Sequence, residues 1–238
     1  MGKNLIQQKR GKGSSTYRAP SFKYKGKAAY GNYNKENVKG DVIELVHCRG
    51  HSAPLMEVRY NNGEKILLQA PEGIRVGDQI EDGPEATVKA GNVLSLKNIP
   101  EGTSVYNIES YPGDGGKFCR AGGTFARVVG KMKGNVVLLL PSKKQREFNP
   151  ECRAMVGIVA GSGRTEKPFL KAGFKHYDMK SRNKMWPQSA GLAMNAVSHP
   201  FGGSSTCSKG KPSTVSRDAP PGRKVGKIAA RRTGRKSR

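Results

Sequence analysis

The sequence predicts a mostly β protein of two small β-barrels, with long basic and largely irregular extensions on either side. Three observations support this fold class. Short runs rich in Val, Ile and Leu recur about every ten residues between residues 41 and 161, separated by turn-forming residues such as Asn62-Gly63. Only 35% of the 238 residues are hydrophobic, which is too few for a core that includes the whole chain. Basic residues are concentrated outside the strand-rich middle.

The expected strands form two series. The first series consists of DVIELVHC, PLMEVRY, EKILLQA and GIRVGDQI, at 41–48, 54–60, 64–70 and 73–80. The segment EDGPEATVKAG, residues 81–91, is the expected boundary. The second series covers 92–100, 103–109, 124–130, 135–141, 145–149 and 152–161. Short strands at this spacing favour two barrels of five to six strands over one sandwich.

Helix is scarce in the sequence. The best candidate is the short, basic run PFLKAGFKHYDMKSRN, residues 168–183. We therefore expect four parts: a basic N-terminal extension, two barrels and a basic C-terminal extension, at 1–36, 37–85, 86–165 and 166–238.

Charge is distributed unevenly along the chain. The 43 Lys and Arg against 18 Asp and Glu give a net charge of +25 and a pI of about 10.2. Residues 1–40, 111–170 and 171–238 carry +9, +7 and +14, whereas residues 41–110 carry −5. A charge this large predicts a polyanionic partner, with nucleic acid the first candidate and an anionic membrane surface the second. The acidic middle should keep one face free of that partner.

Several other classes are disfavoured. The longest apolar run, VVLLL at 136–140, is far shorter than the ~20 residues of a membrane span, and no apolar region follows the basic N-terminus as in a signal peptide. Cysteines at 48, 119, 152 and 207 show no CxxC pairing, which indicates free thiols in a reducing compartment. We expect a soluble intracellular protein that has no membrane partner and is not a homo-oligomer.

The N-terminal residues alternate cations with aromatic rings. Lys and Arg are interspersed with Tyr17, Phe22, Tyr24, Tyr30 and Tyr33, without a helical or strand period. Such rings can stack on nucleobases while the cations neutralise phosphates. The alternative is a disordered, solvated tail. Fully extended, the 36 residues would reach ~120 Å and could thread into a large partner.

The glycine-rich run YPGDGGKFCRAGGTFARVVG, residues 111–130, does not form a P-loop motif, because Gly116-Lys117 is followed by Phe118. Glycines beside Arg120 and Arg127 would still allow backbone N–H groups to approach phosphates closely. The alternative is a pair of tight turns between strands.

Two segments suggest other chemistry. In His47-Cys48-Arg-Gly-His51, no second cluster completes a metal site, and the first two side chains should point to opposite faces of a strand. In AMNAVSHPFGGSST, residues 193–206, His199 lies near four candidate nucleophiles: Ser198, Ser204, Ser205 and Cys207. Residues 171–238 hold only two acids, Asp178 and Asp218, and no G-x-S-x-G elbow. An acyl-transfer catalyst and a general nucleic-acid-compacting protein remain the alternatives.

Three stretches carry a family resemblance: AGSGRTEKPFLKAGFKHYDMK, MWPQSAGLAMNAVSHPFGG and SRDAPPGRKVGKIAARRTGR. They closely resemble the archaeal and eukaryotic-type family of ribosomal large-subunit protein two. The likeness continues upstream through YPGDGGKFCRAGGTFARVV, LLLPSKKQREFNPECRAMVGIVAG and QAPEGIRVGDQI, so it covers nearly the whole chain.

The resemblance implies an OB-like barrel followed by an SH3-like barrel, and extensions that penetrate large-subunit rRNA. It also implies a cytoplasmic, non-enzymatic constituent of the large ribosomal subunit in translation. The protein would support subunit assembly and association, contact neighbouring ribosomal proteins and the small subunit, and buttress RNA near the peptidyl transferase centre. No cofactor or metal site is expected, apart from structural Mg²⁺ or K⁺ ions that could bridge the HPFGG loop to RNA.

The expected RNA-binding residues combine cations with the glycine loops and the HPFGG segment. They are Arg10, Lys12, Arg18, Lys23, Lys25, Lys117, Arg120, Gly122, Gly123, Arg127, Lys180, Arg182, Trp186, Asn195, His199, Pro200, Phe201, Gly202, Gly203, Arg217, Arg223, Lys224, Arg231 and Arg232.

The chain departs from the family pattern around the HPFGG segment. Ser198 replaces the acid that commonly precedes the motif histidine, and Ser204 replaces a third glycine. Many relatives carry arginine where this chain has Ser189 or Ala190. Loss of the acid removes a partner that could orient the imidazole, which weakens the catalytic interpretation. Phe201 stands where the bacterial type has a second histidine, and it should pack or stack.

Overall fold

The structure is a computed structural model that describes residues 6–31, 37–132, 134–204 and 212–232. It divides into two compact units. The β-rich unit comprises Ser21–Phe169, and the basic unit comprises Met1–Pro20 together with Leu170–Arg238. The mostly β prediction is confirmed. Within the described ranges, no helix has the length and apolar character needed to cross a membrane.

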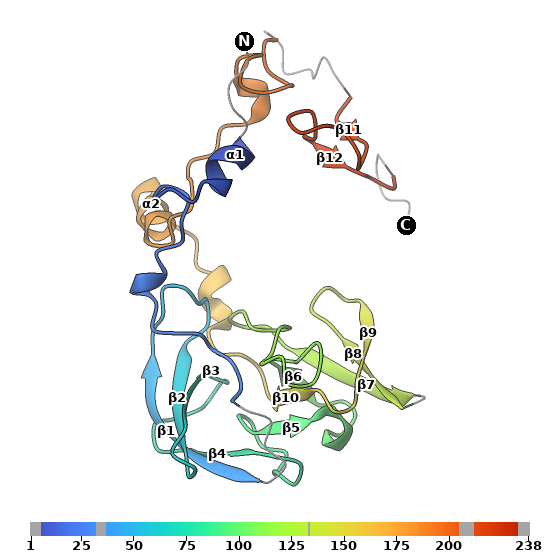
Figure 1. Ribbon diagram of the computed structural model, residues 1–238. Helices are drawn as coiled ribbons and strands as arrows, with labels where there is room; N and C mark the ends of the chain where they lie inside the picture. Colours follow the sequence, from blue (N-terminus) through green and yellow to red (C-terminus); the bar gives the residue numbers. More distant parts are fainter. Residues whose placement is uncertain (1–5, 32–36, 133, 205–211, 233–238) are drawn as a thin grey trace. The chain divides into compact units, whose positions relative to one another are not determined.

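The β-rich unit is built on one ten-stranded sheet with the order β3-β2-β1-β4-β5-β10-β6-β7-β8-β9 (Figure 1). Its strands are β1 Val38–Val46, β2 Leu55–Tyr60, β3 Lys65–Gln69, β4 Gln79–Asp82, β5 Val93–Ser95, β6 Ser104–Tyr106, β7 Ala126–Met132, β8 Asn135–Leu139, β9 Gln145–Phe148 and β10 Arg153–Val156. All neighbouring pairs are antiparallel except β4 and β5.

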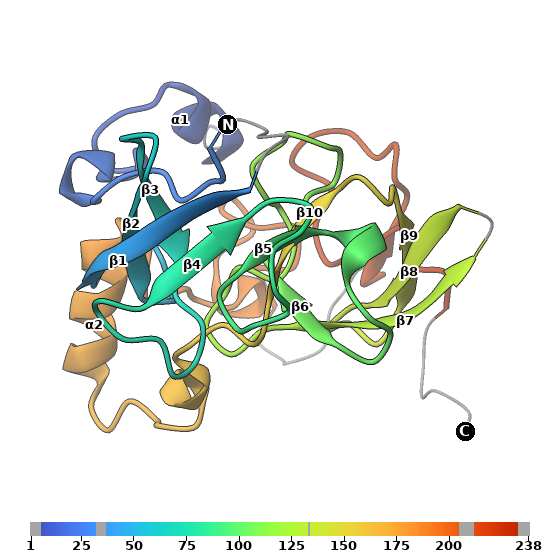
Figure 2. The ribbon, with the colours of Figure 1, turned by 90° about the horizontal axis from the view of Figure 1, so that it is seen from below.

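The sheet has two halves joined at a narrow point. Strands β1–β4 gather on one side and β7–β9 on the other in both ribbon views (Figures 1 and 2). The halves meet where β4 pairs with β5 through one parallel residue pair, Asp82 and Val93. Loop hydrogen bonds also join the halves, because Glu72 N–H donates to Ile158 O and Ala160 N–H donates to Ala70 O, each at 2.9 Å. Hydrophobic packing adds to these few backbone bonds.

Two hydrophobic clusters provide that packing. One lies largely in the β5–β10 half and includes the buried side chains Leu96, Ile108 and Leu138. The other includes Met56 and Leu68 from the β1–β4 half, but also Val93, Tyr106 and Met155 from the second half. The second cluster therefore crosses the joint between the two halves.

The structure corrects one expected strand. In the range 73–80 only the last two residues belong to β4, whereas the first six form turns. Gly73 and Gly77 adopt φ angles of +82° and +91°, and the Asp78 carboxylate accepts a hydrogen bond from Arg75 N–H at 2.8 Å. An Asx-type turn closed by Asp78 thus replaces extended backbone. The remaining nine expected ranges each contain a strand.

The segment 21–31 belongs to the β-rich unit. Ala28 is fully buried and packs with Cys48 and Leu55. Tyr30 is 7% exposed, and its hydroxyl donates to the Asn107 carbonyl at 2.6 Å. Tyr30 therefore does not stack on a partner's bases as expected, because the core already holds its ring. Tyr33 lies outside the described residues.

The basic unit contains short elements that the sequence period did not reveal. Helix α1 covers Ile6–Gly11, and the two-residue strands β11, Thr214–Val215, and β12, Lys227–Ile228, pair in parallel. Helix α2, Ala172–Ser181, lies inside the expected range 168–183, so that prediction is confirmed. None of the residues of α2 is buried within the chain.

Helix α2 ends in a Schellman motif. Lys184 N–H donates to Met179 O at 2.8 Å, and Asn183 N–H donates to Lys180 O at 3.1 Å. Asn183 takes the left-handed position with a φ angle of +50°. Asparagine tolerates this conformation better than most residues, so it can end the helix where glycine is more usual.

Candidate nucleic-acid interface

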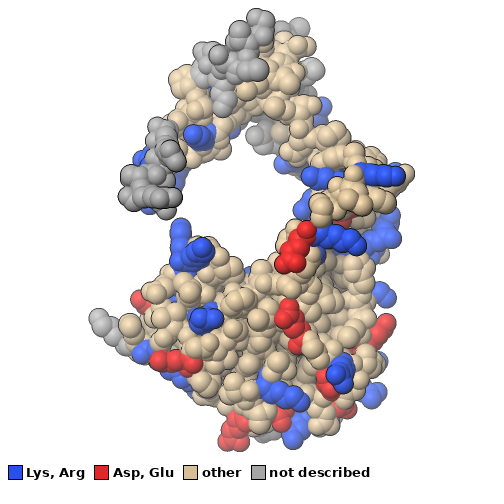
Figure 3. All heavy atoms as spheres, turned by 180° about the vertical axis from the view of Figure 1, so that it is seen from behind, with Lys and Arg blue, Asp and Glu red and all other residues tan. Residues whose placement is uncertain are grey.

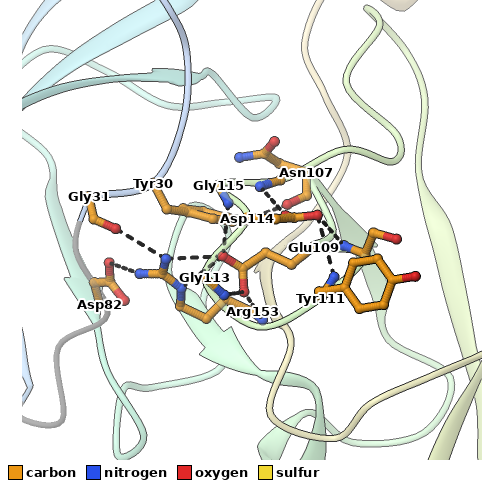
Figure 4. A network of polar contacts seen from close by, with 12 residues as sticks. Tyr30, Gly31, Asp82, Asn107, Glu109, Tyr111, Gly113, Asp114, Gly115 and Arg153 are labelled. Carbon is orange, nitrogen blue, oxygen red and sulfur yellow. Dashed lines mark hydrogen bonds and ion pairs between the residues drawn. The ribbon is translucent and has the colours of Figure 1, made fainter.

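The glycine-rich loop is held from inside by a buried carboxylate (Figure 4). Glu109, fully buried just after β6, accepts hydrogen bonds from Gly113 N–H and Gly115 N–H, each at 3.2 Å. It also accepts one from Arg153 N–H at 2.9 Å. The Arg153 guanidinium completes the contact, with Nη2 at 3.0 Å from Glu109 Oε1. This charge-assisted network fixes the loop backbone relative to β10.

Arg153 also links the two halves of the sheet. Its Nη1 lies 3.9 Å from Asp82 Oδ2 at the end of β4, its Nη2 donates to Gly31 O at 3.1 Å, and its guanidinium lies 4.9 Å from the centre of the Tyr30 ring. Burial raises the pKa of Asp82 to about 6, against the opposing effect of Arg153. A short ion pair would be expected to lower that pKa; at 3.9 Å the attraction does not offset the burial.

Arg120, an expected RNA-binding residue, has its guanidinium engaged within the chain. Its Nη1 donates to Gly116 O at 3.2 Å, and its Nη2 donates to Ala28 O. With the Gln69 amide turned to satisfy both of its ends, Gln69 Oε1 accepts from Arg120 Nε at 3.0 Å. Partial burial lowers the pKa of Arg120. The side chain therefore ties the glycine loop to segment 21–31.

Contacts within the protein also explain why residues 122 and 123 are glycines. A Cβ on Gly122 would lie 2.9 Å from Gly161 O and 3.0 Å from Ser52 O. Gly123 has a φ angle of +76°, and a Cβ there would lie 2.6 Å from Ser162 Cα. At both positions, neighbouring backbone packs too closely to leave room for a side chain.

Lys117 and Arg127 are the exposed cations of this region. Lys117 directly follows the loop that Glu109 holds, and its N–H donates to Ile108 O at 2.8 Å. Arg127 lies on β7, paired in register with Ser104 and Leu139. Over the β-rich unit, the face in Figure 3 shows acidic and basic side chains intermixed. The glycine-rich run thus offers two exposed cations, and Arg146 lies near it with its guanidinium 4.8 Å from the centre of the Phe118 ring.

The HPFGG loop is a compact series of turns. Ser198 N–H and His199 N–H both donate to Asn195 O, at 2.9 and 3.2 Å, and Gly202 N–H donates to His199 O at 2.9 Å. A Cβ on Gly202 would come within 3 Å of Asn195 C, and Gly203 has a φ angle of +88°. Both glycines are required by the loop itself, which brings Asn195, His199, Pro200, Phe201, Gly202 and Gly203 together.

His199 is oriented by its own loop. Its Nδ1 accepts a hydrogen bond from Phe201 N–H at 3.0 Å, so in the neutral ring the proton must be on Nε2. The ring lies against Gly191, where a Cβ would come within 3 Å of three imidazole atoms. In this tautomer Nε2 is a hydrogen-bond donor and has no lone pair to accept a proton. The geometry suits donation to an anionic oxygen better than general-base catalysis.

Phe201 anchors the HPFGG loop to the β11–β12 pair. Its ring is 7% exposed and lies 5.1 Å from the His199 ring, centre to centre. A Cβ on Gly226, whose φ is +85°, would lie 3.1 Å from Phe201 Cζ. Lys227 N–H donates to Ser213 O at 2.7 Å beside it. The prediction that Phe201 packs therefore agrees with its burial.

Metal and thiol chemistry find little support in the described part of the chain. His51 Nδ1 lies 3.2 Å from Cys48 Sγ, but among the described residues no three His, Cys, Asp or Glu side chains could hold a metal ion. Burial raises the pKa of the Cys119 thiol to about 12 and that of Cys152 to about 11. Cys48, Cys119 and Cys152 are free cysteines, whereas Cys207 and Ser205 lie outside the described residues.

Most of the other expected cations are exposed, and two are not. Arg182 forms an ion pair with Asp178 one turn earlier in α2, and Arg223 is half-buried. The exposed cations are Arg10, Lys12, Arg18, Lys23, Lys25, Lys180, Arg217, Lys224, Arg231 and Arg232.

Sequence reasoning missed Asn183, Glu109 and Arg153. An Asn just after a basic helix could have signalled a helix end. No local signal could have paired Glu109 with Arg153, which are 44 residues apart.

Comparisons with known proteins give a consistent result. The family described as Ribosomal Proteins L2, C-terminal domain, matches residues 89–224. A Methanococcus vannielii protein named large ribosomal subunit protein uL2 is 54% identical over 240 residues, covering 99% of this chain and 100% of the relative. Proteins of the same name from Archaeoglobus fulgidus and Natronomonas pharaonis are 53% and 51% identical, covering 98% and 99% of this chain and 99% and 97% of the relatives.

Proposed function

This chain belongs to the ribosomal protein L2 family, and on that premise we propose that it is a structural constituent of the large ribosomal subunit that binds large-subunit rRNA. The relatives carry the name of a large-subunit protein along essentially the full length of the chain. The cytoplasmic ribosome is the proposed location, and rRNA and neighbouring ribosomal proteins are the proposed partners.

One observation carries the rRNA proposal: the charge of the basic unit. Its ranges, 1–20 and 170–238, contain 21 Lys and Arg but only two acids, a net +19 of the chain's +25. Helix α2 has no buried residue, and Phe169, Leu170, Phe174 and Tyr177 are all more than half exposed. Among the described residues of this unit, Phe201 and Val215 are the only buried hydrophobic side chains, so little packing offsets its self-repulsion. A polyanion would supply both neutralisation and contact surface.

We propose a division of labour between the units. The β1–β4 half corresponds to the OB-like barrel and the β5–β10 half to the SH3-like barrel, with the four parts divided at residues 36, 85 and 165. The hydrophobic cluster of the β5–β10 half and the single β4–β5 residue pair support this division, although the second cluster crosses the joint. The exposed cations and the HPFGG loop would contact rRNA near the peptidyl transferase centre. The acidic first half would face solvent, other proteins or the small subunit.

The test is the salt dependence of RNA affinity. The full chain and a fragment of large-subunit rRNA are titrated between 50 and 200 mM KCl by filter binding. Release of counterions from roughly six to ten phosphates would weaken binding by about a thousandfold or more over this range. A nearly flat dependence would contradict a phosphate-dominated interface. Equal affinity for duplex DNA of the same length would favour the compacting protein instead.

The enzymatic rival is tested at His199. In subunits assembled with His199→Ala, we expect peptidyl-transfer rates within about tenfold of wild type, because the donated hydrogen bond positions RNA. Removing the base of a nucleophile–base pair would instead cost roughly 10⁴-fold or more. Val76→Ala, at an exposed position of the β-rich unit outside the proposed RNA contacts, controls for nonspecific effects on assembly.

A further inference from the structure

The basic unit contains a cavity of about 620 Å³, lined in part by the expected RNA-binding residues Arg10 and Trp186. Its walls come from two segments far apart in the sequence. The N-terminal segment contributes Arg10, Thr16 and Tyr17; the end of α2 and the residues after it contribute Met179, Asn183, Lys184, Met185, Trp186 and Gln188. This size is typical of sites that hold a small organic group.

Asn183 builds the cavity. Its position after the Schellman motif directs the amide toward the turn at residues 14–18, where Tyr17 N–H and Arg18 N–H both donate to Ser14 O. Asn183 Nδ2 donates to Ser15 O at 2.6 Å and to Arg18 O at 2.7 Å. One side chain thus holds both ends of the turn that presents Tyr17. The N-terminal part of the cavity wall is therefore held by specific hydrogen bonds.

The lining has the chemistry of a nucleobase site. Trp186 and Tyr17 offer aromatic rings, Met179 and Met185 offer apolar contact, and Gln188 offers an amide. Arg10 and Lys184 are the charged members of the lining, and it includes no carboxylate. Lys175 Nζ lies 5.8 Å from the centre of the Trp186 ring, so a further cation is positioned next to the indole.

We propose that this cavity receives one unstacked base of single-stranded RNA, with Trp186 or Tyr17 stacking on it and Arg10 and Lys184 contacting the flanking phosphates. The proposal rests on the rRNA-binding function and names a site for it. Purely electrostatic contact with a duplex would need neither a recess nor aromatic walls. Single-stranded RNA is recognised by this combination of rings, amides and cations.

The chain's only tryptophan makes the site directly observable. Trp186 emission is followed while the full chain is titrated with octamers of rA, rC or rU, and with an octamer of abasic ribose phosphates. We expect quenching by at least one base-containing octamer and none by the abasic octamer. Equal binding of the abasic octamer, or binding without any change in emission, would overturn the proposal. Tight binding of AMP alone would also overturn it, in favour of a free-nucleotide site.

Three variants distinguish binding in the cavity from general electrostatic attraction of RNA to the basic unit. Trp186→Ala and Tyr17→Ala, measured with labelled octamers, should weaken binding about 5- to 150-fold, the range for loss of one stacking contact. Asn183→Gly keeps the left-handed helix end but removes the amide, so it should weaken binding with α2 intact by circular dichroism. Val76→Ala removes an exposed apolar side chain of the β-rich unit, outside the cavity and the basic unit, and should have little effect.

Failure of this proposal and failure of the proposed function are distinguishable. If the three cavity variants bind octamers as wild type does while rRNA affinity still falls steeply with salt, the base site is wrong and the rRNA function stands. If the wild-type chain binds neither octamers nor rRNA, the function itself fails.

Discussion

Arg153 donates Nε and Nη2 to the same carboxylate oxygen of Glu109, at 3.2 and 3.0 Å, although 44 residues separate them. Both side chains are almost completely buried. The pair connects β10 to the glycine-rich loop, and Arg153 reaches on to Asp82 and Gly31. The loop that resembles a phosphate-binding motif in sequence is thus supported from below by an ionic network.

Glu109→Ala should destabilise the β-rich unit by roughly 3–5 kcal/mol, because it leaves the Arg153 charge buried without its closest carboxylate. The measurement is the free energy of unfolding in urea, followed by the circular dichroism of the sheet. Glu151→Ala is the matched control, since its 2.7 Å ion pair with Lys97 is about half exposed and should contribute less than about 1 kcal/mol. Equal losses in the two variants would contradict the structural role of Glu109.

Asp82 should make the protein less stable as pH rises from about 4 to about 6. Its pKa in the folded state is about 6, raised mainly by burial, whereas the unfolded value is 3.8. The folded state therefore holds this proton more tightly, and the associated stability is lost as pH rises through the folded pKa. Asp82→Asn should be more stable than wild type at pH 7.5 by at most about 3 kcal/mol.

The comparison for Asp82→Asn is unfolding in urea at pH 4 and at pH 7.5. The difference between the variant and wild type should shrink toward pH 4, where Asp82 is protonated in the folded state. A variant that is less stable than wild type at pH 7.5 would show that the Arg153 attraction outweighs burial.

Arg120 and Arg127 should have opposite phenotypes although both were expected to bind RNA. Arg120→Ala removes hydrogen bonds to Gly116 O and Ala28 O and should cost roughly 2–4 kcal/mol of unfolding free energy. Arg127→Ala, at an exposed strand position, should leave stability unchanged and reduce the salt slope of rRNA binding by about one. Urea unfolding and filter binding on both variants make the comparison. A stable Arg120→Ala chain with weakened RNA binding would reverse this assignment.

His199 should be protonated on Nε2 when neutral, because Nδ1 accepts from Phe201 N–H. The ¹⁵N shifts of the imidazole nitrogens report the tautomer directly. Gly191→Ala should displace the ring and disturb this tautomer, since the added Cβ would come within 3 Å of three ring atoms. Gly173→Ala is the control: open space surrounds it, and alanine should favour helix α2 by up to about 1 kcal/mol. A signal from a proton on Nδ1 would contradict the loop geometry.

Local patterns predicted the elements well where one physical requirement dominates. Short runs rich in Val, Ile and Leu between turn-forming residues located nine of the ten strands, because such residues suit buried extended backbone. The apolar pattern failed at 73–80, where the Asp78 carboxylate closes a turn. It also missed α1, β11 and β12, which are too short to show a period.

The candidate interface could likewise be predicted only in part. The sequence indicated which segments are basic and rich in glycine, but it did not distinguish glycines and arginines that serve the fold from those that face a partner. Gly122 and Gly123 pack against protein backbone, and Arg120 is engaged within the chain. Only the tertiary structure distinguishes these residues from exposed ones such as Lys117 and Arg127.

By itself, the sequence determined the mostly β class, the segregation of charge and the family, because composition, short-range period and long motifs are properties of the chain alone. The tertiary structure decided which cations already have partners within the protein. It also decided which glycines allow close contact between two segments of the protein's own backbone. It decided that Asn183 joins two segments around a cavity. Each of these depends on residues that are distant in sequence and meet only after the chain folds. The energy of a buried charge is set by those neighbours and not by the residues beside it in the chain.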